Sequence, residues 1–158
     1  MNKKTMKSIR SSRSIHLIDI ENLCGASNPT VDQVKAAKEK YLDLVSPGER
    51  DQYYLTVSSK NNLEAAMFGW TGARVECNEG HDGADILLAK EILEQPLAES
   101  FDHVYLASGD GGLAPFASKL VNEGVEVSVI SKPRCLSHEY RFIGAEVLYL
   151  QGEYELAA

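Results

Sequence analysis

The chain alternates short β-rich segments with helix-like segments, and this alternation restricts its fold more than any other feature. Strand-like runs are expected at residues 15–19, 52–57, 73–77, 103–107 and 125–130, with a sixth at 146–150. Helix-like stretches lie between them, at residues 30–44, 62–68, 82–93 and 112–122. Thr30 and Gln33 have the spacing of a capping box, which predicts the start of the first helix. This order indicates an α/β fold with a mostly parallel sheet and helices on both faces.

The composition agrees with one globular domain. The chain has 158 residues, of which 44% are hydrophobic and 25% charged. Its apolar runs are only a few residues long, so we expect no membrane-spanning segment and no membrane partner. Three cysteines are too few and too scattered for a disulfide framework, which predicts a reducing, cytoplasmic location.

Charge is distributed unevenly along the chain. The net charge is −7, yet the first 13 residues carry five basic side chains and no acidic one. We therefore divide the chain into a basic, flexible N-terminal arm at residues 1–13 and a single domain at residues 14–158. The acidic domain should repel nucleic acid in general, so a nucleic-acid contact would need the arm, a local basic patch or bound cations. The arm is either a frayed terminus or a phosphate-binding segment.

Carboxylates stand where ligands bind in this architecture. Asp19 ends the first strand, Asp110 follows the fourth, and Asp82 and Asp85 lie at a helix start. In parallel sheets, ligands bind beyond the carboxyl ends of the strands, where the strand order reverses. Carboxylates gathered there would repel one another and need a cation or raised pKa values. An all-oxygen ligand set favours Mg²⁺ or Mn²⁺. Asn22 could supply an amide that orients Asp19.

Each of these residues also has an ordinary structural explanation. Asp19 and Asn22 could form a local turn. Asp82 and Asp110 could cap helices, and Asp85 could interact with a helix dipole. The joint pattern favours a shared site over four unrelated local roles.

Three motifs occur in the order Ile18-Asp-Ile-Glu-Asn22-Leu, Asp82-Gly-Ala-Asp85-Ile-Leu-Leu-Ala and Ser108-Gly-Asp110-Gly-Gly-Leu-Ala-Pro-Phe116. With these motifs, the chain resembles the NYN domain family of the PIN-like nuclease superfamily over about residues 14–150. The resemblance implies a Rossmann-like three-layer αβα sandwich with a mostly parallel sheet of five or six strands. It also implies a Mg²⁺- or Mn²⁺-dependent endoribonuclease that hydrolyses phosphodiester bonds of RNA, expected to be single-stranded.

The resemblance also implies roles for individual residues. The catalytic residues would be Asp19, Asn22, Asp85 and Asp110, the three aspartates also binding the metal, with Asp82 as a further candidate ligand. Candidate substrate-binding residues are Ser108, Ser59, Lys60 and His81.

One position departs from the family pattern. Many family members carry a further acid where this chain has Gly112. The alternative is therefore a catalytically weakened NYN-like module that binds nucleic acid or protein.

Other functions fit the sequence less well. Residues 109–114 match a dinucleotide-binding pattern, but at the fourth strand and without the usual acid about 20 residues later, so we expect no nucleotide cofactor. A phospho-receiver domain would need an acceptor aspartate at the end of the third strand, where this chain has Glu76-Cys-Asn-Glu79. Cys135 and His138 have the spacing of a zinc-binding pair, but one pair does not make a zinc site. The sequence predicts no oligomeric state.

Overall fold

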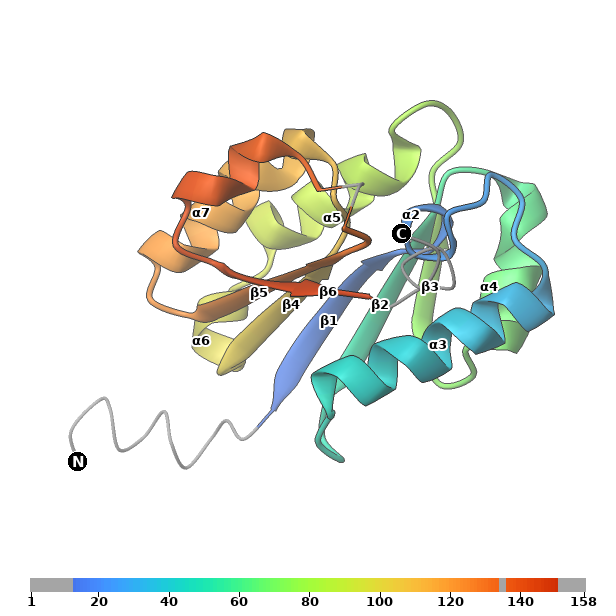
Figure 1. The fold of residues 1–158 in the computed structure, drawn as a ribbon, viewed down its shortest axis with the longest axis horizontal. Helices are drawn as coiled ribbons and strands as arrows, with labels where there is room; N and C mark the ends of the chain where they lie inside the picture. The colour runs from blue at the N-terminus through green and yellow to red at the C-terminus, as the bar shows by residue number, and fades with distance from the viewer. Residues whose placement is uncertain (1–12, 134–135, 151–158) are drawn as a thin grey trace.

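The computed structural model describes residues 13–133 and 136–150, and a six-stranded parallel sheet forms its centre (Figure 1). Every neighbouring pair of strands is parallel, and the strand order is β3-β2-β1-β4-β5-β6. The strands are β1 (Ser14–Asp19), β2 (Gln52–Val57), β3 (Arg74–Cys77), β4 (His103–Ala107), β5 (Glu126–Ser131) and β6 (Glu146–Tyr149). The predicted α/β fold is confirmed, with six strands.

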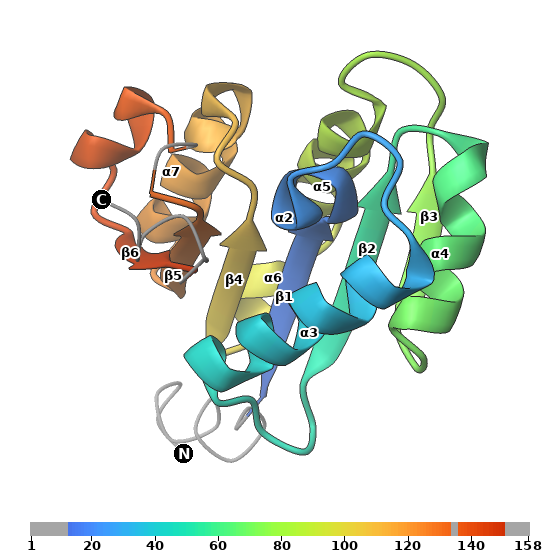
Figure 2. The same ribbon diagram turned by 45° about the vertical axis from the view of Figure 1, so that its right-hand side comes forward.

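Helices cover both faces of this sheet and make a three-layer αβα sandwich. The α-helices are α2 (Ile20–Cys24), α3 (Val31–Val45), α4 (Leu63–Gly69), α5 (Gly83–Glu94), α6 (Leu97–Ser100) and α7 (Ala114–Asn122). Short 3₁₀ helices occur at η1 (Lys60–Asn62), η2 (Gly111–Leu113) and η3 (His138–Phe142). Figure 2 shows α3 and α4 on one face, and α5, α6 and α7 on the other.

Helix α3 begins where its capping box predicts. The Thr30 hydroxyl accepts a hydrogen bond from the Gln33 backbone N–H at 3.1 Å, and the Gln33 side-chain oxygen accepts one from the Thr30 N–H at 2.9 Å. The two bonds satisfy donors that a helix start leaves unpaired. By contrast, α2 and α6 were not predicted, because five- and four-residue helices are too short to show helical periodicity.

The two faces of the central strand β1 are both buried. Leu17 packs in a core with α5 and α7, and Ile18 packs in a second core with α3 and α4. Neither residue exposes any surface. A strand buried on both faces needs a continuous apolar run, which explains the sequence Ile15 to Ile18 apart from His16.

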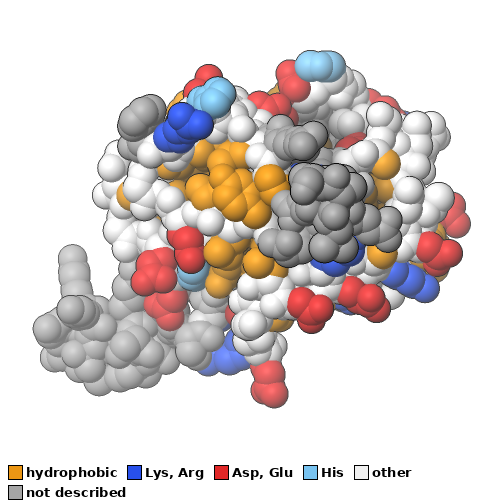
Figure 3. Space-filling model, in the orientation of Figure 1, with side chains coloured by type: hydrophobic (Ala, Val, Ile, Leu, Met, Phe, Trp, Pro, Cys, Tyr) orange, Lys and Arg blue, Asp and Glu red, His pale blue; other side chains and the backbone are white. Residues whose placement is uncertain are grey.

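The first described residue, Arg13, packs against the domain. Most of the predicted basic arm, residues 1–12, lies outside the described residues, but Arg13 donates a hydrogen bond to the Ser100 carbonyl at 3.2 Å and lies over the Phe101 ring. Hydrophobic side chains are visible around the edge strand β6 (Figure 3), where Tyr149 is 41% exposed.

None of the helices in the described part of the chain combines the length and apolar content that crossing a bilayer demands.

Candidate functional site

The strand order reverses at β1, which lies between β2 and β4 in the sheet. Connections from the carboxyl ends of β1 and β4 therefore lead to opposite sides of the sheet and leave a crevice between them. Asp19 is the last residue of β1, and Asp110 follows the end of β4. The topology thus places these two carboxylates at neighbouring strand ends.

Asp19 is fixed by the helix that follows it. The residue is only 8% exposed, and its Oδ1 accepts a hydrogen bond from the backbone N–H of Asn22 at 3.1 Å. The expected link between Asp19 and Asn22 therefore comes from the backbone of Asn22. The Asn22 side chain instead accepts a hydrogen bond from the Gly109 N–H at 3.3 Å. Asp19 and Asn22 thus form a local turn, and the same two residues belong to the expected site.

Asp85 enters the crevice from the first turn of α5. The helix begins tightly against the loop after β3, because a side chain at Gly83 would overlap the Asn78 carbonyl oxygen. Asp82 precedes it with φ of 62° and makes no capping hydrogen bond through its side chain, so the simple capping explanation of Asp82 is wrong. Its carboxylate instead pairs with His81 at 3.0 Å.

Ser108 lies between two of the aspartates. Its hydroxyl lies 3.5 Å from Asp85 Oδ1, to which it donates, and accepts a hydrogen bond from the Asp110 N–H at 3.4 Å. The residue is completely buried. Ser108, a candidate substrate-binding residue from its sequence, therefore contacts the side chain of Asp85 and the backbone of Asp110.

Asp110 is held from two directions. Its Oδ1 accepts a hydrogen bond from the Gly112 N–H at 2.7 Å, so it caps η2 as well as facing the crevice. Its backbone carbonyl accepts a hydrogen bond from the Tyr140 hydroxyl at 2.6 Å, and the Ser137 N–H donates to the Gly109 carbonyl at 3.0 Å. The segment around η3 thereby fixes the loop that carries Asp110.

Four aspartates meet at this point. One carboxylate oxygen from each of Asp82, Asp85 and Asp110 lies within 4.8 Å of the other two. Asp19 lies close enough to this group for the carboxyl groups of Asp85 and Asp110 to influence its pKa. Oxygens bound to one Mg²⁺ lie up to about 4.2 Å apart, given metal–oxygen distances of about 2.1 Å, so small side-chain movements would let this group hold an ion. Although Asp82 is exposed, its carboxylate lies close to those of Asp85 and Asp110.

The electrostatics of the cluster are unfavourable without a bound cation. Burial raises the pKa of Asp19 to about 6, and the negative charge of Glu21 adds to the effect against the Asn22 hydrogen bond. Burial also raises the pKa of Asp85 to about 8, followed by its hydrogen bond with Asp110 and the charge of Asp19. Within the described residues, no lysine or arginine forms an ion pair with these carboxylates. Either protons or a divalent cation must therefore neutralise part of the charge.

The remaining predicted site residues are His81, Ser59 and Lys60. His81 exposes 94% of its side chain beside Asp82. Lys60 is exposed after β2, and the Ser59 hydroxyl caps η1 by accepting from the Asn61 N–H at 3.3 Å. In the part of the chain that the structure describes, no hydrogen bond or ion pair joins Ser59 or Lys60 to the aspartates. Cys135, half of the suggested zinc pair, lies outside the described residues.

Two contributors were not found from the sequence. Tyr140 lies 30 positions after Asp110, and no local pattern connects them. Glu21 lies inside the first motif, between Asp19 and Asn22, and no pattern in the sequence singles it out. Its Oε1 accepts hydrogen bonds from both the backbone N–H and the hydroxyl of Ser58, each at 2.6 Å, and so joins α2 to the end of β2. Its Oε2 is buried without a hydrogen-bond partner among the described residues.

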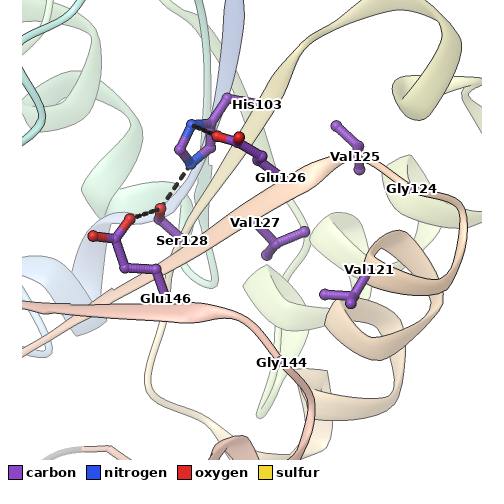
Figure 4. A pocket seen from close by; sticks show the side chains of 9 residues that line it. All are labelled: His103, Val121, Gly124, Val125, Glu126, Val127, Ser128, Gly144 and Glu146. Atoms are coloured by element: carbon purple, nitrogen blue, oxygen red, sulfur yellow. Dashed lines mark hydrogen bonds and ion pairs between the residues drawn. The ribbon is translucent and has the colours of Figure 1, made fainter.

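A second polar cluster lines a hollow of about 340 Å³ at the amino ends of β4, β5 and β6 (Figure 4). His103 Nε2 lies 2.7 Å from Ser128 Oγ, and His103 Nδ1 lies 3.4 Å from a Glu126 oxygen. This order of groups is that of a serine hydrolase triad. However, Ser128 is completely buried and its hydroxyl donates to Glu146 at 2.9 Å, so it is not available as a nucleophile. The cluster links β4, β5 and β6 at their amino ends, whereas Asp110 lies beyond the carboxyl end of β4.

Comparison with known proteins identifies the family of the chain. The NYN domain family matches residues 17–146, which is most of the chain. The chain belongs to the NYN domain family. This membership places the NYN domain described here in the PIN-like nuclease superfamily and indicates a nuclease-type hydrolase with a nucleic-acid substrate.

A solved structure supports the fold of this NYN domain. A protein of unknown function from Vibrio parahaemolyticus is similar with a TM-score of 0.64 and 16% sequence identity, over 90% of this chain and 94% of that one. At this identity the similarity concerns the fold alone. No curated protein matches the sequence.

Proposed function

We propose that this NYN domain is a metal-dependent endoribonuclease that hydrolyses phosphodiester bonds in single-stranded RNA. Asp19, Asp85 and Asp110 would hold Mg²⁺ or Mn²⁺, with Asp82 as a further ligand. The observation that carries the proposal is the packing of four aspartates at the strand-order reversal without a lysine or arginine partner among the described residues.

When bound, the cation would lower the pKa of a water molecule and offset negative charge on the scissile phosphate. The protein side chains prepare the site for this chemistry. Asn22 orients Asp19 through its backbone N–H and ties the loop of Asp110 through its side chain. Asp85 lies among these carboxylates, where burial raises its pKa while no cation is bound. Ser108 is a positioning residue, because its hydroxyl contacts Asp85 and the Asp110 backbone.

Side chains on the surface of the domain would make further contacts with the RNA. His81 and Lys60 are exposed and could contact phosphates that flank the cut, and Ser59 could do so from the loop after β2. The basic arm at residues 1–13 is a further candidate for such a contact. The cytoplasmic location belongs to the same proposal, and Cys24 and Cys77 are free thiols.

The direct test is cleavage of a labelled single-stranded RNA by the purified protein with Mg²⁺ or Mn²⁺, and again with EDTA. We expect cleavage only with the divalent ion, and its loss in Asp19→Asn and Asp110→Asn. If cleavage persisted in both variants, a contaminating nuclease would be the better explanation. A duplex of the same sequence tests the preference for single strands, and a DNA oligonucleotide tests the preference for RNA.

One observation favours a binding module as the second candidate. Gly112, where many relatives carry an acid, contributes no carboxylate to the cluster, and a Cβ there would lie 3.1 Å from Asp110 Oδ1. If the wild-type protein binds RNA but cleaves none under any divalent ion, this second function replaces the first.

A further inference from the structure

Helices α5 and α7 lie side by side on one face of the sheet (Figure 1) and both begin at the carboxylate cluster. Asp85 lies in the first turn of α5, and α7 follows Asp110 through the short helix η2. A groove of about 490 Å³ runs beside these helices. Its lining includes Asp85, Ile86, Ala89, Lys90 and Leu93 of α5, and Phe116 of α7. The groove therefore opens directly at one of the candidate metal ligands.

The walls of this groove are apolar and exposed. Ile86 is 55% exposed and Leu93 is 57% exposed, although both are large aliphatic side chains. Ile86, Ala89 and Leu93 follow one another at helical spacing on the outer side of α5, whereas Leu88 and Ile92 face the core. Contiguous exposed apolar surface next to a polar site is typical of a binding surface.

We propose that this groove receives a nucleobase of the RNA strand, adjacent to the cleaved phosphate. The inference rests on the proposed function. A nucleobase is joined to its phosphate by a single sugar, so a phosphate bound through a cation at Asp85 and Asp110 would bring its base to a neighbouring surface. Asp85 itself lines the groove, so an apolar surface of suitable chemistry is continuous with the metal site.

The chemistry of the groove fits a base and its flanking phosphate. Phe116 offers an aromatic ring, and stacking of bases on aromatic side chains is a common way to bind single-stranded nucleic acid. Lys90 is exposed and lines the groove together with Glu94, and its ammonium group could contact the next phosphate.

This mode of binding determines the kind of substrate. Aliphatic contacts and stacking distinguish poorly between the four bases, since each base has an apolar face. A base in a duplex is already stacked and paired, so it cannot enter the groove without opening the helix. The groove therefore predicts cleavage that tolerates many sequences but requires unpaired nucleotides.

The test compares two double variants with matched exposed apolar side chains. In Ile86→Ser/Leu93→Ser the groove loses its aliphatic wall, whereas Met67→Ser/Phe68→Ser removes side chains that are 55% and 61% exposed on α4. Binding of a fluorescent single-stranded RNA is measured in Ca²⁺, together with an abasic oligonucleotide of the same length. We expect the groove variant to bind RNA about tenfold more weakly, with unchanged binding of the abasic strand and no effect in the α4 control.

The possible outcomes separate this inference from the proposed function. If the wild type binds and cleaves RNA and the groove variant binds equally well, the inference fails and the proposed function stands. If the wild type neither binds nor cleaves RNA, the proposed function fails and the inference fails with it. If the groove variant alters self-association in light scattering without altering RNA affinity, the groove is a protein interface and the inference is overturned. Should the double variant unfold at a lower temperature, Ile86→Gln alone replaces it in the same comparison.

Discussion

The side-chain oxygen of Asn22 accepts a hydrogen bond from the backbone N–H of Gly109, 3.3 Å away and 87 positions later in the chain. This bond joins the helix after β1 to the loop after β4. Because the backbone N–H of Asn22 also donates to the Asp19 carboxylate, Asn22 contacts one candidate metal ligand directly and the loop of another through Gly109. Asn22 therefore helps to fix the position of Asp19 relative to Asp110.

Replacing Asn22 by alanine tests this link. We expect Asn22→Ala to weaken Mg²⁺ binding by about tenfold or more, as is typical when an outer partner of a metal site is lost, and to lower the free energy of unfolding by about 1 kcal/mol. Titration calorimetry with Mg²⁺ and chemical denaturation measure the two effects. Asn61→Ala, which removes an exposed amide from η1, serves as the control and should change neither quantity. Unaltered Mg²⁺ affinity in Asn22→Ala would refute the positioning role.

Asp85 and Asp82 should differ in their contributions to metal binding. Asp85 is partly buried among carboxylates, whereas Asp82 is exposed and paired with His81. We expect Asp85→Asn to reduce Mg²⁺ affinity by more than about a hundredfold, beyond the loss typical of outer partners, and Asp82→Asn to reduce it by less than about tenfold. The shift of the unfolding temperature with Mg²⁺ concentration reports both affinities. Equal losses in the two variants would contradict this order.

Stability without metal should depend on pH in a defined direction. Burial raises the pKa of Asp85 from 3.8 to about 8 and that of Asp19 from 3.8 to about 6. At a pH between the unfolded and the folded pKa of a carboxyl group, the folded protein holds a proton that the unfolded chain has lost. The free energy of unfolding therefore falls as the pH rises from about 4 to about 8. Thermal unfolding in EDTA at pH 5 and pH 8.5 measures this fall.

The same experiment has an internal control and a dependence on metal. Asp85→Asn removes the group with the higher pKa, so its stability should fall less steeply with pH. Mg²⁺ should restore stability chiefly at the higher pH, because carboxylates bind metal in their ionised form. A metal-free protein that became more stable across this range would show that these carboxylates do not titrate as the buried cluster requires.

Tyr140 should stabilise the loop of Asp110 from outside the carboxylate cluster. Its buried hydroxyl donates to the Asp110 carbonyl oxygen at 2.6 Å, so Tyr140→Phe leaves that oxygen without its partner. We expect a loss of about 1 kcal/mol in the free energy of unfolding and a several-fold weaker Mg²⁺ affinity. Tyr149→Phe is the matched control, since Tyr149 is 41% exposed on β6 and should affect neither measurement. Equal behaviour of the two variants would remove the link between η3 and the site.

Much of the architecture could be predicted from local patterns. Apolar runs such as Ile15 to Ile18 predicted strands, and the Thr30–Gln33 capping box predicted where α3 begins. These signals are local, because they arise from residues a few positions apart. The position of Asp19 and Asp110 at strand ends followed from the same reasoning, since parallel strands place their carboxyl ends along one edge.

The sequence by itself determined the order of strands and helices, the family motifs and the aspartates that could gather at one edge of the sheet. Only the tertiary structure decided that Asp82 approaches Asp85 and Asp110, that the Asn22 side chain binds Gly109, and that Tyr140 holds Asp110. The physical reason is that these contacts join elements far apart in the chain. Their distances depend on how helices pack against the sheet and how loops close, which no short stretch of sequence encodes.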